Sequence, residues 1–300
     1  MIVMTLDTES SGVGTEDQVV EIGLVFRDLC SASLINSWST LIKPSVVIHP
    51  SARAAHHITD KELLEAPTIE QIMPLLKKHF SIADAIVGHS LAFDIRMLLQ
   101  SGVSEAILPP SRICTWLCAR HLWPDAPGYS NQTLRYWHNL EVELNGFPHR
   151  ALPDAIVTDA LMLYMLRENL PERLIELTTT PVLQTKVLFG KHRGKLWSEI
   201  DIQYYRWLLH PKRQPPFNEE VRYAAAHWLK VKEEEKMKDL KTYVFTAEDK
   251  RNFDPQTFTK RLKEAGFEFD SETCPVKIKK PWDQRDGGNG STVFRQWRKE

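Results

Sequence analysis

A short, largely apolar run at the start of the chain ends in two acidic residues, and this feature constrains the fold more than any other. Residues 2–6 are apolar or β-branched, which predicts a buried strand that leads directly into Asp7-Thr8-Glu9. Side chains alternate along a strand, so Asp7 and Glu9 are expected on one face, about 7 Å apart. Carboxylates at that spacing repel each other unless a cation lies between them. Oxygen ligands favour Mg²⁺ or Mn²⁺ over zinc, although an isolated acidic pair is also typical of a solvated strand end.

Residues 85–94 carry the second part of the pattern. They predict a strand, a turn and the first turn of a helix, because apolar residues recur at helical spacing after Ser90. Asp94 is therefore expected on the helix that follows a core strand, from where its carboxylate can face the same site as Asp7 and Glu9. An acid near a helix N-terminus is also favoured by the helix dipole alone, so this position has a purely structural interpretation as well.

Residues 148–168 carry the third part. Proline is tolerated in the first turn of a helix but costs about 3 kcal/mol deeper inside, so Pro153 places the start of a helix near Leu152. His149 then lies in the entering loop and Asp154 in the first turn, where both side chains can approach one substrate. Asp159 lies about 140° further around this helix, and we interpret it as a surface acid.

Taken in order, three motifs resemble those of the DnaQ-like (DEDDh) 3′ to 5′ exonucleases. They are Asp7-Thr8-Glu9, Gly88-His89-Ser90-Leu91-Ala92-Phe93-Asp94 and His149-Arg150-Ala151-Leu152-Pro153-Asp154-Ala155. Shorter likenesses occur at His57-Ile58-Thr59, Arg112-Ile113-Cys114-Thr115, Leu122-Trp123-Pro124 and Tyr129-Ser130-Asn131. Residues 189–195 and 205–209 are similar to the C-terminal segment of bacterial enzymes of the exodeoxyribonuclease X type, so the match covers about residues 1–210. Pro153 departs from the residue that is usual at its place in the family.

The resemblance implies two-metal hydrolysis of DNA from its 3′ end, with release of nucleoside 5′-monophosphates from single strands and duplexes. Asp7, Glu9 and Asp154 would hold one Mg²⁺ ion and Asp7 and Asp94 the second, and Mn²⁺ would substitute. His149 would accept the proton of the attacking water, a task that suits histidine because this residue type titrates near neutrality.

Contacts to the substrate are expected around the carboxylates. The loop after the first strand contains Gly12, whose lack of a side chain allows close approach of the backbone, and Val13, which we hypothesise to wedge against the last base pair of a duplex. An ordinary hairpin loop is an equal alternative. His57 has a structural alternative too, because residues 59–62 form a capping box that can simply start a helix. The full set of expected substrate contacts is Thr8, Gly12, Val13, His57, His89, Phe93, Lys191, Arg193 and Lys195.

The net charge of the chain is only −1, so binding of nucleic acid must depend on local basic patches. Residues 186–213 contain seven Lys or Arg against two acids, with Trp197, Tyr204, Tyr205 and Trp207 interleaved. This composition favours phosphate contacts and base stacking. The alternative is a solvated turn followed by a helix with core aromatics, and under either interpretation we expect most of these aromatics to be buried.

Cysteine usage and hydropathy indicate a protein of the reducing cytoplasm. The cysteines are scattered, without paired CxxC units, so neither a zinc site nor a disulfide framework is predicted. Cys114, Cys118 and His121 have helical spacing and are expected on one helix. The N-terminal apolar run has no basic flank, and no run approaches 18 apolar residues, so we predict neither a signal peptide nor a membrane contact.

The order of elements predicts an α/β protein with a ribonuclease H-like mixed sheet flanked by helices. Strands are expected near residues 2–8, 18–26, 34–43 and 85–89, and helices near 69–80, 93–101, 114–122, 132–140 and 151–168. The predicted division is an exonuclease domain at 1–170, a linker at 171–188, a basic helical segment at 189–242, and a small strand-helix-strand extension with a flexible tail at 243–300.

The leading function is a DNA 3′ to 5′ exonuclease in repair or end processing. Two alternatives stay open: an RNA-trimming exonuclease with the same residues, and a scaffold whose C-terminal part tethers a polymerase or repair partner. A homodimer is expected only by analogy with the family.

Overall fold

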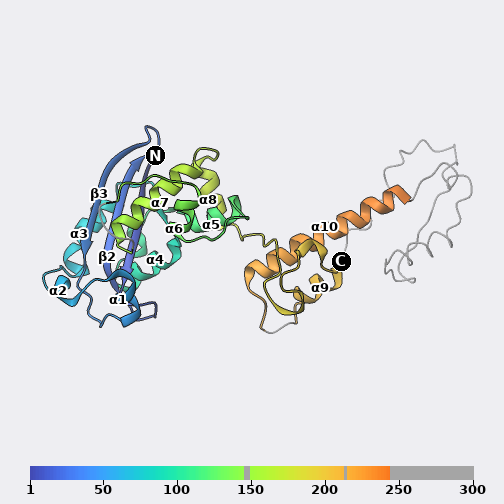
Figure 1. Ribbon diagram of the computed structural model, residues 1–300, viewed down its shortest axis with the longest axis horizontal. Helices are drawn as coiled ribbons and strands as arrows, with labels where there is room; N and C mark the ends of the chain where they lie inside the picture. Colours follow the sequence, from blue (N-terminus) through green and yellow to red (C-terminus); the bar gives the residue numbers. More distant parts are fainter. Residues whose placement is uncertain (145–148, 213–214, 244–300) are drawn as a thin grey trace, which may run out of the picture. The chain divides into compact units, whose positions relative to one another are not determined.

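A mixed sheet of five strands forms the centre of the fold. The computed structural model describes residues 1–144, 149–212 and 215–243, with side chains described up to residue 236. Its strands have the order β3-β2-β1-β4-β5, and Figure 1 labels β2 and β3 of this sheet. Their bounds are β1 Ile2–Ser10, β2 Val19–Asp28, β3 Ser33–Leu41, β4 Ala85–Gly88 and β5 Ser111–Cys114. The first three strands pair antiparallel, while β4 pairs parallel with β1 and with β5.

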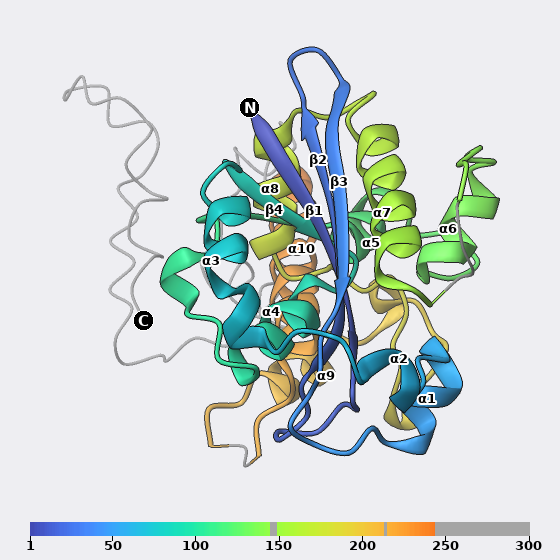
Figure 2. The same cartoon turned by 90° about the vertical axis from the view of Figure 1, so that its left-hand side faces the viewer.

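Helices cover both faces of this sheet. The N-terminal helices are α1 Pro50–His56, α2 Asp60–Leu63, α3 Ile69–Phe80 and α4 Leu91–Gln100. They are followed by α5 Thr115–Leu122, α6 Asn131–Trp137, α7 Ala151–Met165 and α8 Pro171–Thr179, and then by α9 Ile202–Leu208 and α10 Glu219–Tyr243. Single 3-10 turns occur at Glu105–Ile107, Gly190–His192 and Trp197–Glu199. Figure 2 shows α3 and α4 on one side of β1 and α7 on the other.

The alternation of side chains along β1 divides the core into two clusters. Met4 and Leu6 are fully buried against the layer of α3 and α4. Val3 points to the opposite face and packs in the cluster that contains Val157 and Leu161 of α7. The same period of two therefore directs the odd-numbered residues of β1, which include Asp7 and Glu9, toward the α7 face.

A glycine on β2 allows α7 to approach the sheet closely. Gly23 lies opposite Asp7 in the β1–β2 register. A Cβ atom at Gly23 would lie 2.4 Å from the carbonyl carbon of Ala151 and 2.4 Å from the amide nitrogen of Leu152. Backbone atoms at this distance leave room for glycine alone, and the start of α7 is thereby brought next to the end of β1.

The predicted fold class is confirmed, and the differences lie in short elements. Strand β5 was not predicted, because its four residues become a strand only through pairing with β4. Cys114 ends β5 and precedes α5, so it does not share the helix of Cys118 and His121. The interpretation of Asp159 as a surface acid is wrong. Asp159 is 3% exposed, and its carboxylate accepts hydrogen bonds from Arg27 at 2.6 to 3.1 Å.

Residues 187–229 form a further hydrophobic cluster around Trp197 and Tyr205, both fully buried. Asn218 caps α10, since its side-chain oxygen accepts a hydrogen bond from the Val221 amide at 2.9 Å. The Arg120 guanidinium on α5 contacts the Glu220 carboxylate of α10 at 2.7 and 3.0 Å. The predicted extension at 243–300 lies outside the described residues apart from Tyr243. No helix in the described part of the chain is long and apolar enough to cross a membrane.

Candidate active site

Three carboxylates from two elements meet at the end of β1. Asp7 and Glu9 are separated by one residue on β1, and Asp154 lies in the first turn of α7. One oxygen of each lies within 4.8 Å of the others. The period of the strand and the close approach of α7 at Gly23 together produce this cluster. The sequence placed these three residues in one site, and the structure brings them together.

Asp94 approaches from the opposite face of β1. It lies in the first turn of α4 and is 3% exposed. One carboxylate oxygen accepts a hydrogen bond from the backbone amide of Thr8 at 2.9 Å and another from the Thr8 hydroxyl at 2.7 Å. Ser90, with a left-handed φ of 71°, turns the chain sharply from β4 into α4. These two hydrogen bonds from Thr8 therefore fix the orientation of the Asp94 carboxylate.

The electrostatics of the site favour a bound cation. Burial, followed by the charge of Asp154, raises the pKa of Glu9 to about 8. Burial also raises the pKa of Asp94 to about 7, against the opposing hydrogen bonds from Thr8. The pKa of Asp7 lies well above its usual range because of burial and the charges of Asp94 and Glu9. Acidic oxygens that are this crowded and this desolvated fit a divalent ion, which supplies the missing positive charge.

His149 stands beside Asp154 at the entrance to α7. Its backbone is left-handed, with φ 61°, and its side chain is exposed. Its amide donates a hydrogen bond to one Asp154 oxygen at 3.0 Å, while the Gln132 side-chain amide donates to the other oxygen at 3.1 Å. Asn131 donates to the Asp154 backbone carbonyl at 3.0 Å. Asp154 is thus held by α6 and by the loop that carries His149.

Glu21 of β2 and Arg150, which immediately precedes α7, support the site and were not predicted from the sequence. Glu21 lies directly opposite Glu9 in the β1–β2 register and is 5% exposed. The Arg150 guanidinium donates to both Glu21 oxygens, at 2.9 and 2.8 Å, and the Ala151 amide donates to one of them at 3.0 Å. A glutamate inside an otherwise apolar strand pattern is the signal that could have identified Glu21, because buried acids are rare without a partner.

The loop that contains Gly12 and Val13 is held in place by hydrogen bonds. The Asp17 carboxylate accepts hydrogen bonds from the Ser11 hydroxyl and the Gly14 amide, both at 2.7 Å. A Cβ atom at Gly12 would lie 2.5 Å from the same carboxylate. The Arg96 guanidinium of α4 donates to the Val13 carbonyl at 3.3 Å, and the Val13 side chain is 77% exposed. The loop therefore presents an apolar side chain from a supported backbone.

The other expected contacts near the site differ in how accessible they are. His57 is exposed and ends α1 in a left-handed conformation, while the predicted capping box at Thr59 is present at α2. Phe93 is half-buried, with the Arg96 guanidinium 5.2 Å from its ring centroid. Both ring nitrogens of His89 are used within the protein, at 2.9 Å from the Thr115 hydroxyl and 2.7 Å from the Tyr129 carbonyl. Only the ring face of His89 is left for a nucleotide.

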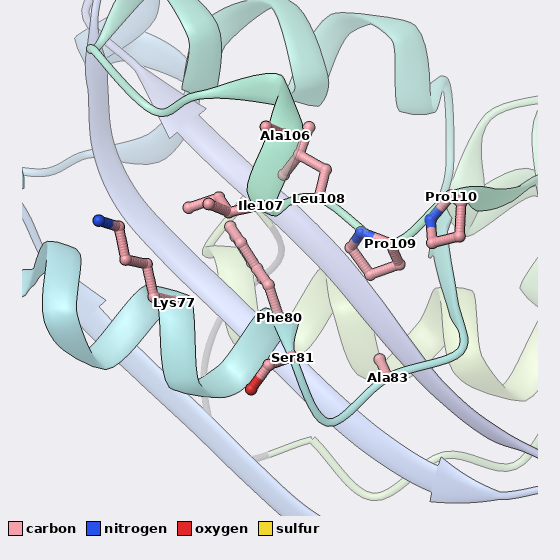
Figure 3. Close-up of a pocket in the computed structure, with 9 residues that line it drawn as sticks. All are labelled: Lys77, Phe80, Ser81, Ala83, Ala106, Ile107, Leu108, Pro109 and Pro110. Carbon is pink, nitrogen blue, oxygen red and sulfur yellow. The ribbon is translucent and has the colours of Figure 1, made fainter.

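A separate pocket of about 390 Å³ opens between the end of α3 and the segment before β5 (Figure 3). Lys77 and Ser81 are the polar residues among its described lining, which otherwise consists of apolar side chains such as Phe80 and Leu108. This lining contains none of the carboxylates described above. The pocket is distinct from the candidate active site.

Comparisons with known proteins agree with this arrangement. Residues 4–162 match the family model described as exonuclease, a segment that includes all of the carboxylates at the site. The chain belongs to the exonuclease family. This exonuclease is 32% identical over 231 residues to exodeoxyribonuclease 10 of Escherichia coli K12. The aligned region covers 75% of the chain and 97% of that protein. It is 34% identical to the DNA polymerase III subunit epsilon of Treponema pallidum, over 54% of the chain and 75% of the relative.

A solved structure extends the agreement to three dimensions. The exonuclease resembles exonuclease X in complex with 5′ overhanging duplex DNA, with 31% identity and a TM-score of 0.50. The superposition covers 59% of the chain and 99% of the solved protein. Since family, relatives and fold agree, the chain is a 3′ to 5′ exonuclease with a ribonuclease H-like core, as the three ordered motifs predicted.

Proposed function

We propose that the exonuclease removes nucleotides from the 3′ ends of single-stranded and duplex DNA, with Mg²⁺ as its metal. The observation that carries the proposal is the convergence of Asp7, Glu9 and Asp154 within 4.8 Å, with Asp94 held behind them by Thr8. The names of its relatives support DNA as the substrate, because an exodeoxyribonuclease and a DNA-bound exonuclease X are among them. The proposed products are nucleoside 5′-monophosphates, as the family resemblance implies; their release requires the 3′ oxygen of the penultimate nucleotide to be the leaving group.

The four acids and His149 have separate tasks in this proposal. Asp7, Glu9 and Asp154 would hold one divalent ion, and Asp7 and Asp94 would hold the other. Two bound metal ions would stabilise the entering and leaving oxygens of an in-line displacement. A ring nitrogen of His149 accepts the proton of the attacking water. The hydrogen bond from the His149 amide to Asp154 keeps this base beside the carboxylate cluster.

Residues around the cluster would bind the terminal nucleotides. The backbone at Thr8 and Gly12 approaches the sugar and phosphate, because neither position presents a long side chain. Val13 and Phe93 offer apolar surface to the bases, and His57 offers an exposed imidazole. His89 contributes a ring face. Lys191, Arg193 and Lys195 are proposed to contact phosphates further along the strand.

Digestion of 5′-labelled oligonucleotides tests the proposal. Single-stranded DNA, blunt duplex and RNA of one sequence are incubated with Mg²⁺ or EDTA, with wild type and with Asp7→Asn and His149→Gln variants. We expect stepwise shortening of DNA that requires Mg²⁺, is abolished in Asp7→Asn and falls by roughly 10²- to 10⁴-fold in His149→Gln. Shortening of RNA at the higher rate would instead support the RNA-trimming alternative, and no metal-dependent shortening would refute the proposal.

DNA repair or end processing in the cytoplasm is the biological role that we propose for this activity. Association with a second copy or with a polymerase or repair factor remains a prediction. The segment expected to tether such a partner, residues 243–300, lies almost wholly outside the described residues. A deletion of that segment that leaves digestion unchanged but abolishes association would support tethering.

A further inference from the structure

A basic hairpin between α8 and α9 displays the three cations of residues 191–195. Its ends are joined by hydrogen bonds from the Val187 amide to the Lys195 carbonyl at 2.9 Å and from the Gly194 amide to the Val187 carbonyl at 2.8 Å. Lys186 and Leu196 form an antiparallel bridge below them. Trp197 anchors the base, since it is fully buried and its indole N–H donates to the Lys186 carbonyl at 3.2 Å. The hairpin is therefore an ordered element.

The cations of this hairpin are exposed to solvent. Lys191, Arg193 and Lys195 are exposed, and none of them forms an ion pair within the part of the chain whose side chains are described. Asp201 is engaged elsewhere, because its carboxylate caps α9 by accepting a hydrogen bond from the Gln203 amide at 2.8 Å. The pKa of His192, which lies between Lys191 and Arg193, is lowered by partial burial and by the charges of Lys191 and Lys195.

Aromatic rings continue this basic surface along α9. The rings of Tyr204 and Trp207 are stacked, with centroids 5.2 Å apart and planes 24° apart. The Lys191 ammonium lies 5.7 Å from the Tyr204 ring centroid, and the His192 ring meets Tyr204 edge-on at 4.5 Å. Of the four aromatics in this segment that were expected to be mostly buried, Trp197 and Tyr205 are fully buried, Tyr204 is half-buried and Trp207 is 46% exposed. Cations and ring faces therefore lie side by side.

We propose that this hairpin and the Tyr204–Trp207 stack form a second nucleic-acid site, which binds single-stranded DNA. Lys191, Arg193 and Lys195 contact phosphates, and a base stacks on Trp207. A single strand fits this surface because the faces of its bases are free to stack on the exposed indole, whereas a duplex hides them. As a consequence, DNA stays bound between successive cuts. The choice of DNA rests on the proposed function, but binding here requires neither metal nor cleavage.

Binding of fluorescent oligo(dT) to the full-length chain in EDTA tests this site without the nuclease reaction. The double variant Lys191→Ala/Lys195→Ala, called the hairpin variant, is compared with Lys77→Ala/Lys78→Ala. The control removes equal charge from the exposed end of α3. We expect only the hairpin variant to lose affinity. Its slope of log K against log salt concentration should fall by about 1.4, because two phosphate contacts are lost at about 0.7 each on a single strand.

The stacking contact is tested by Trp207→Ala and Trp207→Phe. The alanine variant should lose affinity roughly 5- to 150-fold, while phenylalanine restores most of it, because a ring of either kind can stack on a base. Thermal unfolding of each variant establishes that it is folded. Unchanged affinity and salt slope in the hairpin variant, or equal loss in Trp207→Ala and Trp207→Phe, would overturn the proposal.

The two proposals fail in different ways. A chain that binds oligo(dT) through these residues but never shortens DNA would refute the proposed function and support this site. A chain that shortens DNA while the hairpin and Trp207 variants bind like wild type would support the function and refute the site. With both sites active, the hairpin variant should dissociate from a long single strand after fewer cuts than the wild type.

Discussion

The Glu21 carboxylate on β2 binds the Arg150 guanidinium through two hydrogen bonds of 2.9 and 2.8 Å. Glu21 also accepts a hydrogen bond from the Ala151 amide, and it lies opposite Glu9 in the sheet. Arg150 separates His149 from the first residue of α7. The pair therefore links the strand that pairs with β1 to the loop and helix turn that carry His149 and Asp154.

Substitution of Glu21 by Gln should impair catalysis through geometry. A neutral amide binds the guanidinium more weakly, so the start of α7 shifts and His149 loses its alignment. A displacement of about 1 Å at a catalytic group costs about 100-fold in rate, and we expect kcat to fall 10- to 100-fold with a smaller change in KM. Glu105→Gln is the matched control, because it weakens the exposed Arg112–Glu105 pair. Equal effects of the two variants on kcat would contradict a positioning role.

Gly23→Ala should disturb the same junction from the sheet side. The new Cβ would lie 2.4 Å from backbone atoms of Ala151 and Leu152, which cannot rotate away. Overpacking of this kind costs about 1–3 kcal/mol, and we expect a lower midpoint of thermal unfolding together with weaker Mg²⁺ activation. Gly128→Ala is the control, since its Cβ meets a threonine side chain at 3.3 Å. Wild-type Mg²⁺ activation in Gly23→Ala would show that α7 needs no such close approach.

The stability of the metal-free protein should depend on pH in a defined direction. Glu9 and Asp94, with pKa values of about 8 and about 7, keep their protons in the folded chain to a higher pH than in the unfolded chain. The free energy of unfolding in EDTA should therefore fall as pH rises from about 4.5 toward 8, by at most about 1.4 kcal/mol per pH unit for each group.

Mg²⁺ should reverse this loss, because the ion binds the deprotonated carboxylates. The gap between the unfolding midpoints in Mg²⁺ and in EDTA should widen between pH 6 and 8.5, as measured by calorimetry. Glu9→Gln should show a smaller gap and a flatter profile in EDTA. A gap that is independent of pH would mean that the carboxylates of the folded protein are already ionised at pH 6.

Val13→Gly should slow digestion of blunt duplex DNA more than that of single strands. The exposed Val13 side chain sits on a loop supported by Arg96 and Asp17, so it can press against a terminal base pair while the loop keeps its shape. Rates on both substrates are compared with those of Leu170→Gly, which removes an equally exposed side chain at the start of α8. Equal slowing on duplex and single strand would refute the wedge.

Asp159→Asn should destabilise the fold without changing the chemistry. Arg27 and Asp159 form a buried ion pair, with side chains that are 14% and 4% exposed. Removal of one charge leaves the other buried without compensation, at a cost of about 3–5 kcal/mol in the free energy of unfolding. Denaturant titration measures this loss, and Glu176→Gln in the exposed Arg173–Glu176 pair should change stability by less than about 1 kcal/mol. A similarly small change in Asp159→Asn would indicate that water reaches Arg27.

Local patterns in the sequence were sufficient for the fold class, and the three ordered motifs predicted the residues of the carboxylate site. A strand alternates with period two and a helix with 3.6 residues per turn, so burial can be read from a few neighbouring residues, and Asp7, Glu9, Asp94 and Asp154 each occur at the edge of such a pattern. The positions of Gly12 and Val13 in a loop after the first strand followed in the same way.

Partners far apart along the chain could not be read from these patterns. Glu21 and Arg150 are 129 residues apart, and Arg27 and Asp159 are 132 apart. No local period reports which strand lies beside which or where a helix crosses the sheet, and for that reason Asp159 was placed on the surface and Glu21 was overlooked. The strand register and the close approach of α7 at Gly23 are what bring these charges together, and they exist only once the chain has folded.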